Sequence, residues 1–566
     1  MPTLHEPTFD LAKEPKPLIA AVTSIGSLYA SADSRFSTSR KLFEEGYKAL
    51  EDYTREDRSR FQETWVLQAY ILLEVCGIYV CDDSLLSKAQ NIHNILVSAI
   101  RELQMTHDGH ASRLETPNSP ELIPVTVEDN PATLQRRWLD FREEEARKRC
   151  IYSIYLLDSQ LSIACNLRPQ ISALELKYKL PCADDIWSAP TAEAWDRIQK
   201  QHFRSFNERD DHFGTDEATP SQGSLYGSTQ DLLDRRAVER DPPTLRLLWY
   251  SPFAALVLVT QLQMMARELT HATCLLERPK HTQRSLSILT EAQHGQISQA
   301  LRNIAELIPR PSPPPSASFA HPDKTNEDGQ FAPLWHSFWL TWRYTSITIS
   351  HPDSLLVTGV VETNLPAAIA TAGHLARPRR KRNRDLYEDR DVFRILSDLE
   401  HALERIGKGP DGRSGHGDGS GAGDVAGSGG VEYENPFQTL LAFKICLVGW
   451  RIVRLTMAEA GTTTSQERRG SCEESKRFAK YNPSRFVLQS IMAAINKEDV
   501  GDPGYGGAGG GAAVLESEVE YLRWVQEQLL RRSVWPIGKW EAAIVEEAVV
   551  EAAEYVSVLR DCEGGF

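Results

Sequence analysis

Apolar residues recur at helical spacing along most of this chain, and segments with the alternating pattern of strands are rare. In the first part of the chain the pattern predicts helices over residues 17–30, 39–51, 59–80, 84–104, 131–165 and 172–179. Later helices are predicted over 245–276 and 293–308, in an aromatic-rich segment from 332, and in two amphipathic segments from 514 and 540. The segment TWVLQAYILLEVCGIYV is apolar around most of its circumference, so we expect neighbouring helices to bury it. The sequence therefore predicts an all-α fold, a bundle-like arrangement of many helices.

Polar, proline-rich and glycine-rich segments interrupt these helices and define the expected domain organisation. Residues 1–200 are predicted to form the main domain, followed by a polar insert at 201–241 and a helical continuation at 242–308. A proline-rich linker at 309–331 precedes a helical segment at 332–406 that contains a basic cluster. The remainder is predicted as a disordered glycine-rich tract at 407–433, a helical segment at 434–500, a glycine-rich linker at 501–513 and C-terminal helices at 514–566. The length of 566 residues exceeds the ~250–300 at which one core stops growing, so two or more subdomains are expected.

The overall charge argues against direct contact between the chain and nucleic acid. The formal net charge is −15, whereas domains that bind nucleic acid are usually basic. Nine widely spaced cysteines suggest a reducing compartment rather than a disulfide framework. The start, MPTLHEPTFDLAKEPKP, lacks the apolar stretch of a secretory signal, and the longest apolar run, FAALVLVTQLQMM, is shorter than the ~18 residues of a membrane span. We therefore expect a soluble intracellular protein without membrane contact.

Motifs that would carry catalysis or metal binding are incomplete. Three aspartate pairs lack the further carboxylate one helical turn on that magnesium coordination would use, and they are better explained as caps or solvated loop acids: Asp82-Asp83, Asp184-Asp185 and Asp210-Asp211. Zinc needs four closely spaced ligands, and each candidate pair is alone: Cys76 with Cys81, His107 with His110, and His271 with Cys274. Glycines between 504 and 509 match the dinucleotide fingerprint by letter, but no strand precedes them. We therefore expect no catalytic, cofactor-binding or metal-binding residue in this chain.

The stretch from residue 143 to 187 is the densest in charged and apolar side chains. Three acid–base pairs with the favourable order at i,i+4 stabilise the start of its helix: Glu143/Arg147, Glu144/Lys148 and Glu145/Arg149. Asp158 lies among apolar positions, so we expect it to form a buried structural ion pair, with Arg168 as a candidate partner. The Arg168-Pro169 step ends the helix, and a capping box at 172–175 predicts the start of another.

The order of features in this stretch is similar to that of a known family. The stretch contains a basic pair (Lys148, Arg149), an aromatic residue (Tyr152) and an aromatic-x-Leu-Asp motif (Tyr155, Leu157, Asp158). These are followed by an x-Pro corner (Arg168, Pro169), a Leu-Pro helix end (Leu180, Pro181) and a tryptophan (Trp187). The stretch resembles the regulatory, or middle homology, domain of fungal-specific transcription factors of the xylanolytic-activator type. That domain is found downstream of C2H2 or zinc binuclear cluster modules. The resemblance extends over about residues 4–200, with Tyr152 and Leu167 at positions where the family usually has Trp and Gly.

The resemblance implies a nuclear regulatory domain of an RNA polymerase II transcription factor that acts through co-regulators, with a homodimer as one option. In that family a zinc module upstream of the regulatory domain binds DNA. This chain starts at the regulatory domain, so we expect zinc and DNA contact only through a missing N-terminal module, or DNA contact through a partner. Two alternatives stay open: an all-helical metabolic enzyme with an unrecognised pocket, and a co-regulator that acts through protein partners without touching DNA.

A basic cluster interrupts the acidic chain between residues 377 and 384. Its six cationic residues are Arg377, Arg379, Arg380, Lys381, Arg382 and Arg384. By composition alone the cluster fits a nuclear localisation signal and a solvated loop about equally well. The resemblance favours the signal, because the family acts in the nucleus.

Overall fold

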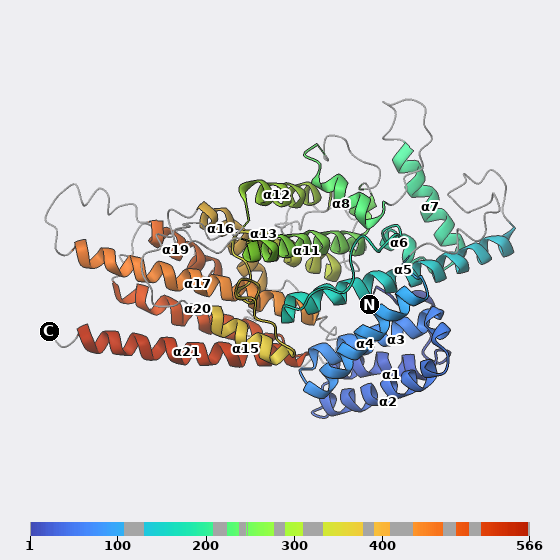
Figure 1. Ribbon diagram of the computed structural model, residues 1–566, viewed down its shortest axis with the longest axis horizontal. Coiled ribbons are helices and arrows are strands. Elements are labelled where there is room, and N and C mark those ends of the chain that lie inside the picture. The colour runs from blue at the N-terminus through green and yellow to red at the C-terminus, as the bar shows by residue number, and fades with distance from the viewer. Residues whose placement is uncertain are drawn as a thin grey trace, which may run out of the picture. The chain divides into compact units, whose positions relative to one another are not determined.

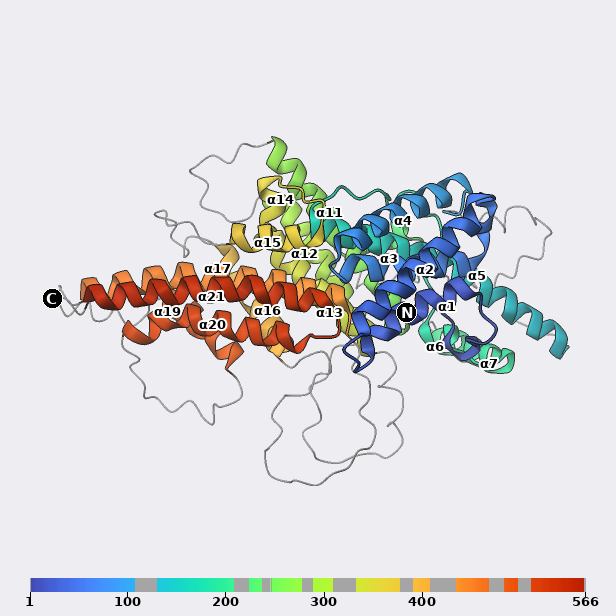
Figure 2. The same cartoon turned by 90° about the horizontal axis from the view of Figure 1, so that it is seen from below.

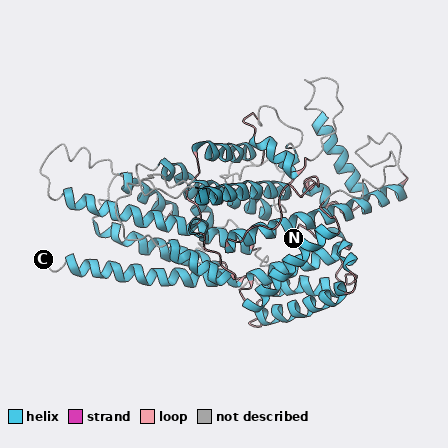
Figure 3. Cartoon of the chain, viewed as in Figure 1, coloured by secondary structure: helices cyan, strands magenta, loops and turns pink. Residues whose placement is uncertain are grey.

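The computed structural model describes residues 2–106, 130–207, 223–236, 245, 247–276, 289–308, 332–376, 390–407, 434–467, 483–496 and 511–563. These residues are mostly helical, and they contain no β-strand (Figure 3). One isolated antiparallel bridge pairs Lys179 with Ser224. The predicted all-α class is confirmed. Within the same residues, every helix is too short or too polar to cross a membrane.

The chain divides into two compact units, each assembled from several stretches of sequence. Unit 1 comprises residues 1–163, 168–265 and 295–339, and unit 2 comprises residues 164–167, 266–294 and 340–566. Helices that contribute residues to both units are α5 (Pro131–Cys165), α11 (Pro252–Leu276), α12 (Glu291–Glu306) and α13 (Ala332–Ser350).

Unit 1 begins with four helices that lie side by side, drawn in blue in Figure 1. They are α1 (Lys16–Gly26), α2 (Arg35–Arg55), α3 (Thr64–Tyr79) and α4 (Asp83–Glu102). The short 3-10 helix η1 (Glu6–Thr8) precedes them, and η2 (Ser27–Tyr29) and η3 (Arg58–Gln62) lie in the connections between them. These helices fall within a few residues of the predicted ones. Asp82 caps α4, because its carboxylate accepts hydrogen bonds from the backbone N–H groups of Ser84 and Leu85.

Helix α3 is buried nearly all round, as its apolar composition predicts. Its close packing depends on Gly77, where a Cβ would lie 2.8 Å from both the Ala89 side chain and the Leu85 carbonyl oxygen of α4. Only a residue without a side chain lets the two backbones approach so closely. Both helices also hydrogen-bond to α5, through Tyr79 of α3 and His93 of α4.

Unit 1 also contains shorter elements that follow α5. They are α6 (Asp184–Trp187), α7 (Ala192–Asn207), α8 (Leu225–Leu233) and the 3-10 helix η4 (Leu247–Tyr250). Helix α8 and the end of α7 lie within residues 201–241, where the sequence predicted only a polar insert. Leu225 and Leu232 of α8 are fully buried, which explains why this segment is ordered despite its polar neighbours.

The helix predicted over 172–179 is wrong. The capping box does form, since Glu175 accepts a hydrogen bond from the Ser172 backbone N–H, but it closes a turn and not a helix. Tertiary hydrogen bonds hold the following backbone instead. Lys177 N donates to the Thr106 carbonyl at 2.9 Å, and Leu180 N donates to the Gly223 carbonyl at 2.9 Å. These tertiary hydrogen bonds replace the ones that a short helix would have made.

The predicted break after Cys165 has a conformational cause that the sequence analysis had assigned to proline. Asn166 adopts a left-handed conformation (φ 58°), which terminates α5, and asparagine tolerates that region better than most residues. In unit 2 its side-chain amide donates hydrogen bonds to the carbonyl oxygens of Leu355 and Val360, at 3.0 and 2.7 Å. These bonds fix the left-handed residue in place.

The remaining helices of unit 2 follow α13 in the chain. They are α14 (Ser354–Thr358), α15 (Leu365–Ala376), α16 (Arg390–Gly407), α17 (Pro436–Glu467), α19 (Pro483–Ile495), α20 (Gly511–Arg531) and α21 (Pro536–Glu563). Helices α17, α20 and α21 lie side by side in both views (Figures 1 and 2), and α15 packs against α21. Helix α20 begins at Gly511, inside the predicted linker at 501–513.

Several predictions concern residues outside the described ones. These are the basic cluster at 377–384, the pair Asp210-Asp211, His107 and His110, the proline-rich linker at 309–331, the glycine-rich tract over 408–433 and the glycines at 504–509.

Candidate functional site

Helix α5 carries most of the signature residues. Its middle turns are fully buried at Cys150, Ile151, Tyr152 and Ile154. A helix that is buried on several faces must pair every charged group it carries, because an unpaired charge in an apolar interior is very costly. Two charged clusters on α5 meet this demand, one at Arg149 and one at Asp158.

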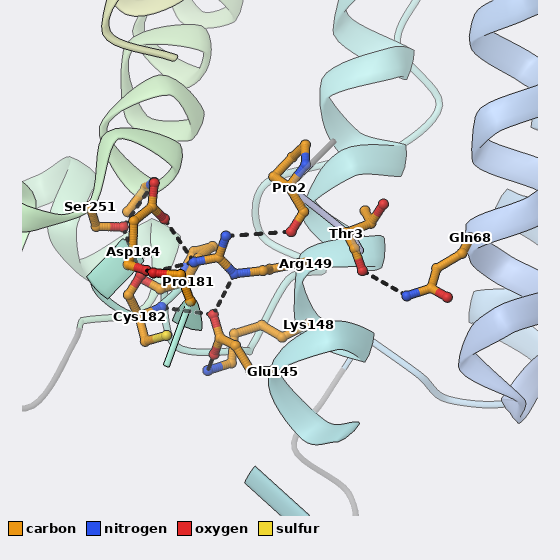
Figure 4. Close-up of polar contacts among 12 residues, drawn as sticks. Pro2, Thr3, Gln68, Glu145, Lys148, Arg149, Pro181, Cys182, Asp184 and Ser251 are labelled. Carbon is orange, nitrogen blue, oxygen red and sulfur yellow. Dashed lines mark hydrogen bonds and ion pairs between the residues drawn. The ribbon is translucent and has the colours of Figure 1, made fainter. Parts of the chain in front are cut away.

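Arg149 is a buried cation whose donors are directed at acceptors from distant parts of the sequence (Figure 4). Its Nε donates to Glu145 at 3.0 Å, one turn earlier on α5. Its Nη2 donates to the Asp184 carboxylate at 2.9 Å and to the Cys182 carbonyl at 3.2 Å. The guanidinium carbon also lies 4.7 Å from the centre of the Trp187 ring. Arg149 therefore joins α5 to the Leu-Pro-Cys segment and to α6.

Glu145 completes this network as a fully buried carboxylate. It accepts hydrogen bonds from Arg149, from the Lys148 ammonium at 2.7 Å and from the Cys182 backbone N–H at 2.8 Å. Burial alone would raise the pKa of Glu145, but Lys148 and Arg149 outweigh it and hold the pKa below its usual range. Burial raises the pKa of Asp184, and its pairing with Arg149 offsets only part of that effect. The cluster thus balances two acids against two bases in the interior.

Asp158 forms the second cluster, in which a buried histidine bridges two acids. His93 of α4 contacts Asp158 through Nε2 at 3.1 Å and Glu74 of α3 through Nδ1 at 2.8 Å. Asp158 also accepts hydrogen bonds from the backbone N–H groups of Gln170 and Ile171, at 2.9 and 2.7 Å. All three ionisable side chains are less than 5% exposed. The cluster joins α3, α4, α5 and the corner that follows α5.

The protonation of this cluster follows from its geometry. Burial disfavours a charged imidazole, but Glu74 and Asp158 outweigh it and raise the pKa of His93 to about 10. Burial likewise raises the pKa of Glu74, with His93 opposing it. His93 is therefore an imidazolium at neutral pH, and its two N–H groups donate to the two carboxyl groups.

Asp158 forms a buried ion pair, as predicted, but with a different partner from the one predicted. The residue is a buried structural ion, but it pairs with His93, whereas Arg168 is exposed. His93 was missed because a lone histidine has no sequence motif. Its position on the buried stripe of α4 that includes Ala89 and Leu96 was the available signal.

The other signature residues on α5 and beyond are mostly core residues. The Tyr152 hydroxyl donates to the Tyr178 carbonyl at 2.9 Å, and the Tyr155 hydroxyl donates to Gln261 at 2.5 Å. Leu157, Leu180, Pro181 and Trp187 are buried, and Pro169 is half-buried. Asp184 corrects the sequence analysis, which treated its pair as solvated or capping acids: it is the buried partner of Arg149.

The three acid–base pairs predicted along α5 form only in part. Glu145 pairs with Arg149 as expected, and Glu143 lies 3.7 Å from Arg147. Lys148, however, pairs with Glu145 and not with the predicted Glu144. A buried acceptor is less screened by water than an exposed one, so it attracts the ammonium more strongly.

The thiols near these clusters are not activated. Burial raises the pKa of Cys150 and of Cys182, and it raises that of Cys165 to about 11. A nucleophilic or metal-binding cysteine requires the thiolate, which these environments disfavour. Among the described residues, His, Cys, Asp and Glu side chains form no group of three that could hold a metal ion. The contacts of the two buried clusters hold α3, α4, α5 and α6 together.

Comparison with known proteins shows what the first part of the chain is similar to. Residues 1–222 match the family model described as "Fungal specific transcription factor domain". The resemblance inferred from the signature residues is thereby confirmed over this part of the chain.

Individual relatives share the same region at low identity. The "Nicotinate catabolism cluster-specific transcription factor" of Emericella nidulans is 27% identical over 203 residues, which cover 35% of this chain and 21% of the relative. "Zinc finger protein zas1" of Schizosaccharomyces pombe is 24% identical over 196 residues, 34% of this chain and 20% of the relative. "Transcription factor PfmaH" of Pestalotiopsis fici is 26% identical over 134 residues, which cover 24% of this chain and 13% of the relative.

The aligned part of this chain thus spans about a fifth or less of the length of these curated relatives. No solved structure matches the chain.

Proposed function

We propose that this chain is the regulatory part of a fungal transcription regulator that acts in the nucleus on RNA polymerase II genes. The observation that carries the proposal is the family match over residues 1–222, which contains both buried clusters of α5. Relatives over the same region are named as transcription factors or zinc finger proteins.

The clusters suggest how such a part works. Arg149 and Asp158 tie α3, α4, α5 and α6 into one core, so the outer faces of these helices are held in fixed positions. A preorganised surface loses little conformational entropy when a co-regulator binds. The proposed activity is therefore non-enzymatic, and its partners are transcriptional co-regulators.

DNA contact is proposed to come from elsewhere. A chain with a formal net charge of −15 repels the phosphate backbone, so a zinc module outside this sequence or a DNA-binding partner would supply the contact. Zinc would then belong to that module, with none bound by the residues of this chain.

A tethering experiment tests this function. The chain, fused to an unrelated DNA-binding module in a fungal host, is expected to change transcription of a reporter that carries the module's site. The Arg149→Met fusion should lose this effect, because it leaves the buried Asp184 without its cation and Glu145 with Lys148 alone, a change that costs about 3–5 kcal/mol.

The Arg168→Gln fusion is the matched control, since this second signature arginine is exposed. It should behave like the unaltered chain at equal expression. A reporter that responds identically to the module alone and to the full fusion would contradict the proposed function.

A further inference from the structure

Helix α21 of unit 2 presents an exposed face that is both apolar and acidic. Trp540 and Val550 are 46% and 54% exposed. With Ala543, Glu547 and Glu554 they recur at steps of three and four residues, which places all five on one stripe of the helix. Large apolar side chains left in water along a continuous stripe indicate a surface that another segment covers.

The charges on this face indicate which kind of segment that is. Exposed acids near or on the stripe are Glu546, Glu547, Glu551 and Glu554, and Lys539 is the exposed cation at its start. Tyr555 adds a second aromatic ring that is 38% exposed. Arginine side chains satisfy both features, because a guanidinium pairs with carboxylates in a planar fork and also stacks on aromatic rings.

A second copy of α21 fits this face poorly. The stripe has the 3–4 spacing of a coiled-coil seam, with Glu547 and Glu554 at seam positions. In a symmetric parallel pair each of these carboxylates would face its own copy, and like charges in such a seam repel.

The sequence contains a segment of complementary charge that directly follows a helix packed against α21. Helix α15 packs against α21 and ends at Ala376, directly before the basic cluster at 377–384 (Figures 1 and 2). One turn before that end, Gly373 lies so close to Ile544 that a Cβ there would be 2.6 Å from the isoleucine Cγ2. Glu547 and Glu551 follow Ile544 by three and seven residues, so they lie on the same side of α21.

We propose that the basic cluster, residues 377–384, binds in cis to the acidic and aromatic face of α21 formed by Trp540, Glu547, Val550, Glu551 and Glu554. The acids occupy about 10 Å of helix from Glu547 to Glu554, at about 1.5 Å per residue. Eight extended residues reach about 26 Å or more, so the cluster is long enough to meet all three acids.

The contact has a consequence for any other acidic partner of the cluster. Cations bound to α21 cannot bind a second acidic surface at the same time, so α21 and that other surface must compete for the basic cluster. The proposed contact rests on charge and position alone and does not depend on the role suggested for the cluster in nuclear import.

The test uses the full chain and a labelled peptide of sequence RPRRKRNR, with binding followed by fluorescence anisotropy. Changing the six cations of the cluster to alanine in the chain frees the face. This variant should bind the peptide at least about tenfold more tightly than the unaltered chain, in which the tethered cluster competes at an effective concentration on the order of a millimolar.

Glutamine at Glu547, Glu551 and Glu554, introduced into the alanine variant, should weaken peptide binding about tenfold or more. The matched control changes three exposed acids outside α21, Glu6, Glu45 and Glu56, to glutamine and should leave binding unchanged. Circular dichroism confirms that each variant keeps its helical content.

Three results would overturn the proposal. Equal peptide affinity for the unaltered chain and the alanine variant would mean that the cluster does not occupy the face. Equal losses in the two glutamine variants would reveal only general attraction to an acidic protein. A dimer in light scattering that dissociates in the Glu547, Glu551 and Glu554 variant would assign the face to a second copy.

Discussion

At the scale of single residues, His93 makes the stability of unit 1 depend on pH. The pKa of His93 is about 10 in the folded chain against 6.5 for a free histidine, so its stabilising contribution is fully present below about pH 6.5 and is lost as pH rises through about 10. We expect His93→Gln to lower the free energy of unfolding at pH 7 by about 3–5 kcal/mol, since it removes the cation between two buried acids.

Urea unfolding followed by tryptophan fluorescence at several pH values checks this. The unaltered chain should lose stability relative to His93→Gln between pH 7 and pH 10, so that the two midpoints converge. Parallel pH profiles for the two chains would contradict an imidazolium at His93.

At the scale of elements, the approach of α3 and α4 depends on Gly77. Alanine is normally favoured over glycine inside a helix by about 1 kcal/mol. At Gly77, however, a methyl group would overlap Ala89 and the Leu85 carbonyl, so Gly77→Ala should lower the free energy of unfolding by about 1–3 kcal/mol. Gly295 of α12 is the control, because a Cβ there meets nothing within 4 Å.

Thermal melts of the two variants should therefore move in opposite directions. Gly295→Ala is expected to keep or raise the melting temperature through helix propensity alone. A stabilising Gly77→Ala would show that α3 and α4 can separate without cost.

At the scale of the whole molecule, a basic cluster of six cations is set in a chain with a formal net charge of −15. If it serves nuclear import, changing Arg379, Arg380, Lys381 and Arg382 to alanine should move a fluorescent fusion of the chain from nucleus to cytoplasm, because an import receptor recognises the cations through an acidic groove. An unchanged nuclear signal, with the fusion intact on a gel, would reduce the cluster to a solvated charged segment.

The sequence predicted the helices of unit 1 correctly where the helical spacing of apolar residues continues over many residues. The helix predicted over 131–165 coincides with α5, and the all-round apolar segment became the buried helix α3. Prediction failed where local signals are short. The capping box at 172–175 forms its hydrogen bond, yet the backbone of the next residues bonds to Thr106 and Gly223 and forms no helix. Propensity over eight residues is too weak to oppose such tertiary bonds.

The sequence by itself determined the helical class, the burial of α3 and α5, and the family signature around Arg149 and Asp158. All three features depend on the spacing and order of residues within one segment, and this information is present in the sequence before the chain folds. Tertiary structure alone decided the partners of the buried charges. His93 lies 65 residues from Asp158, and Asp184 lies 35 residues from Arg149. An interior charge requires a counter-charge at close range, but only the packing of helices determines which distant residue provides it.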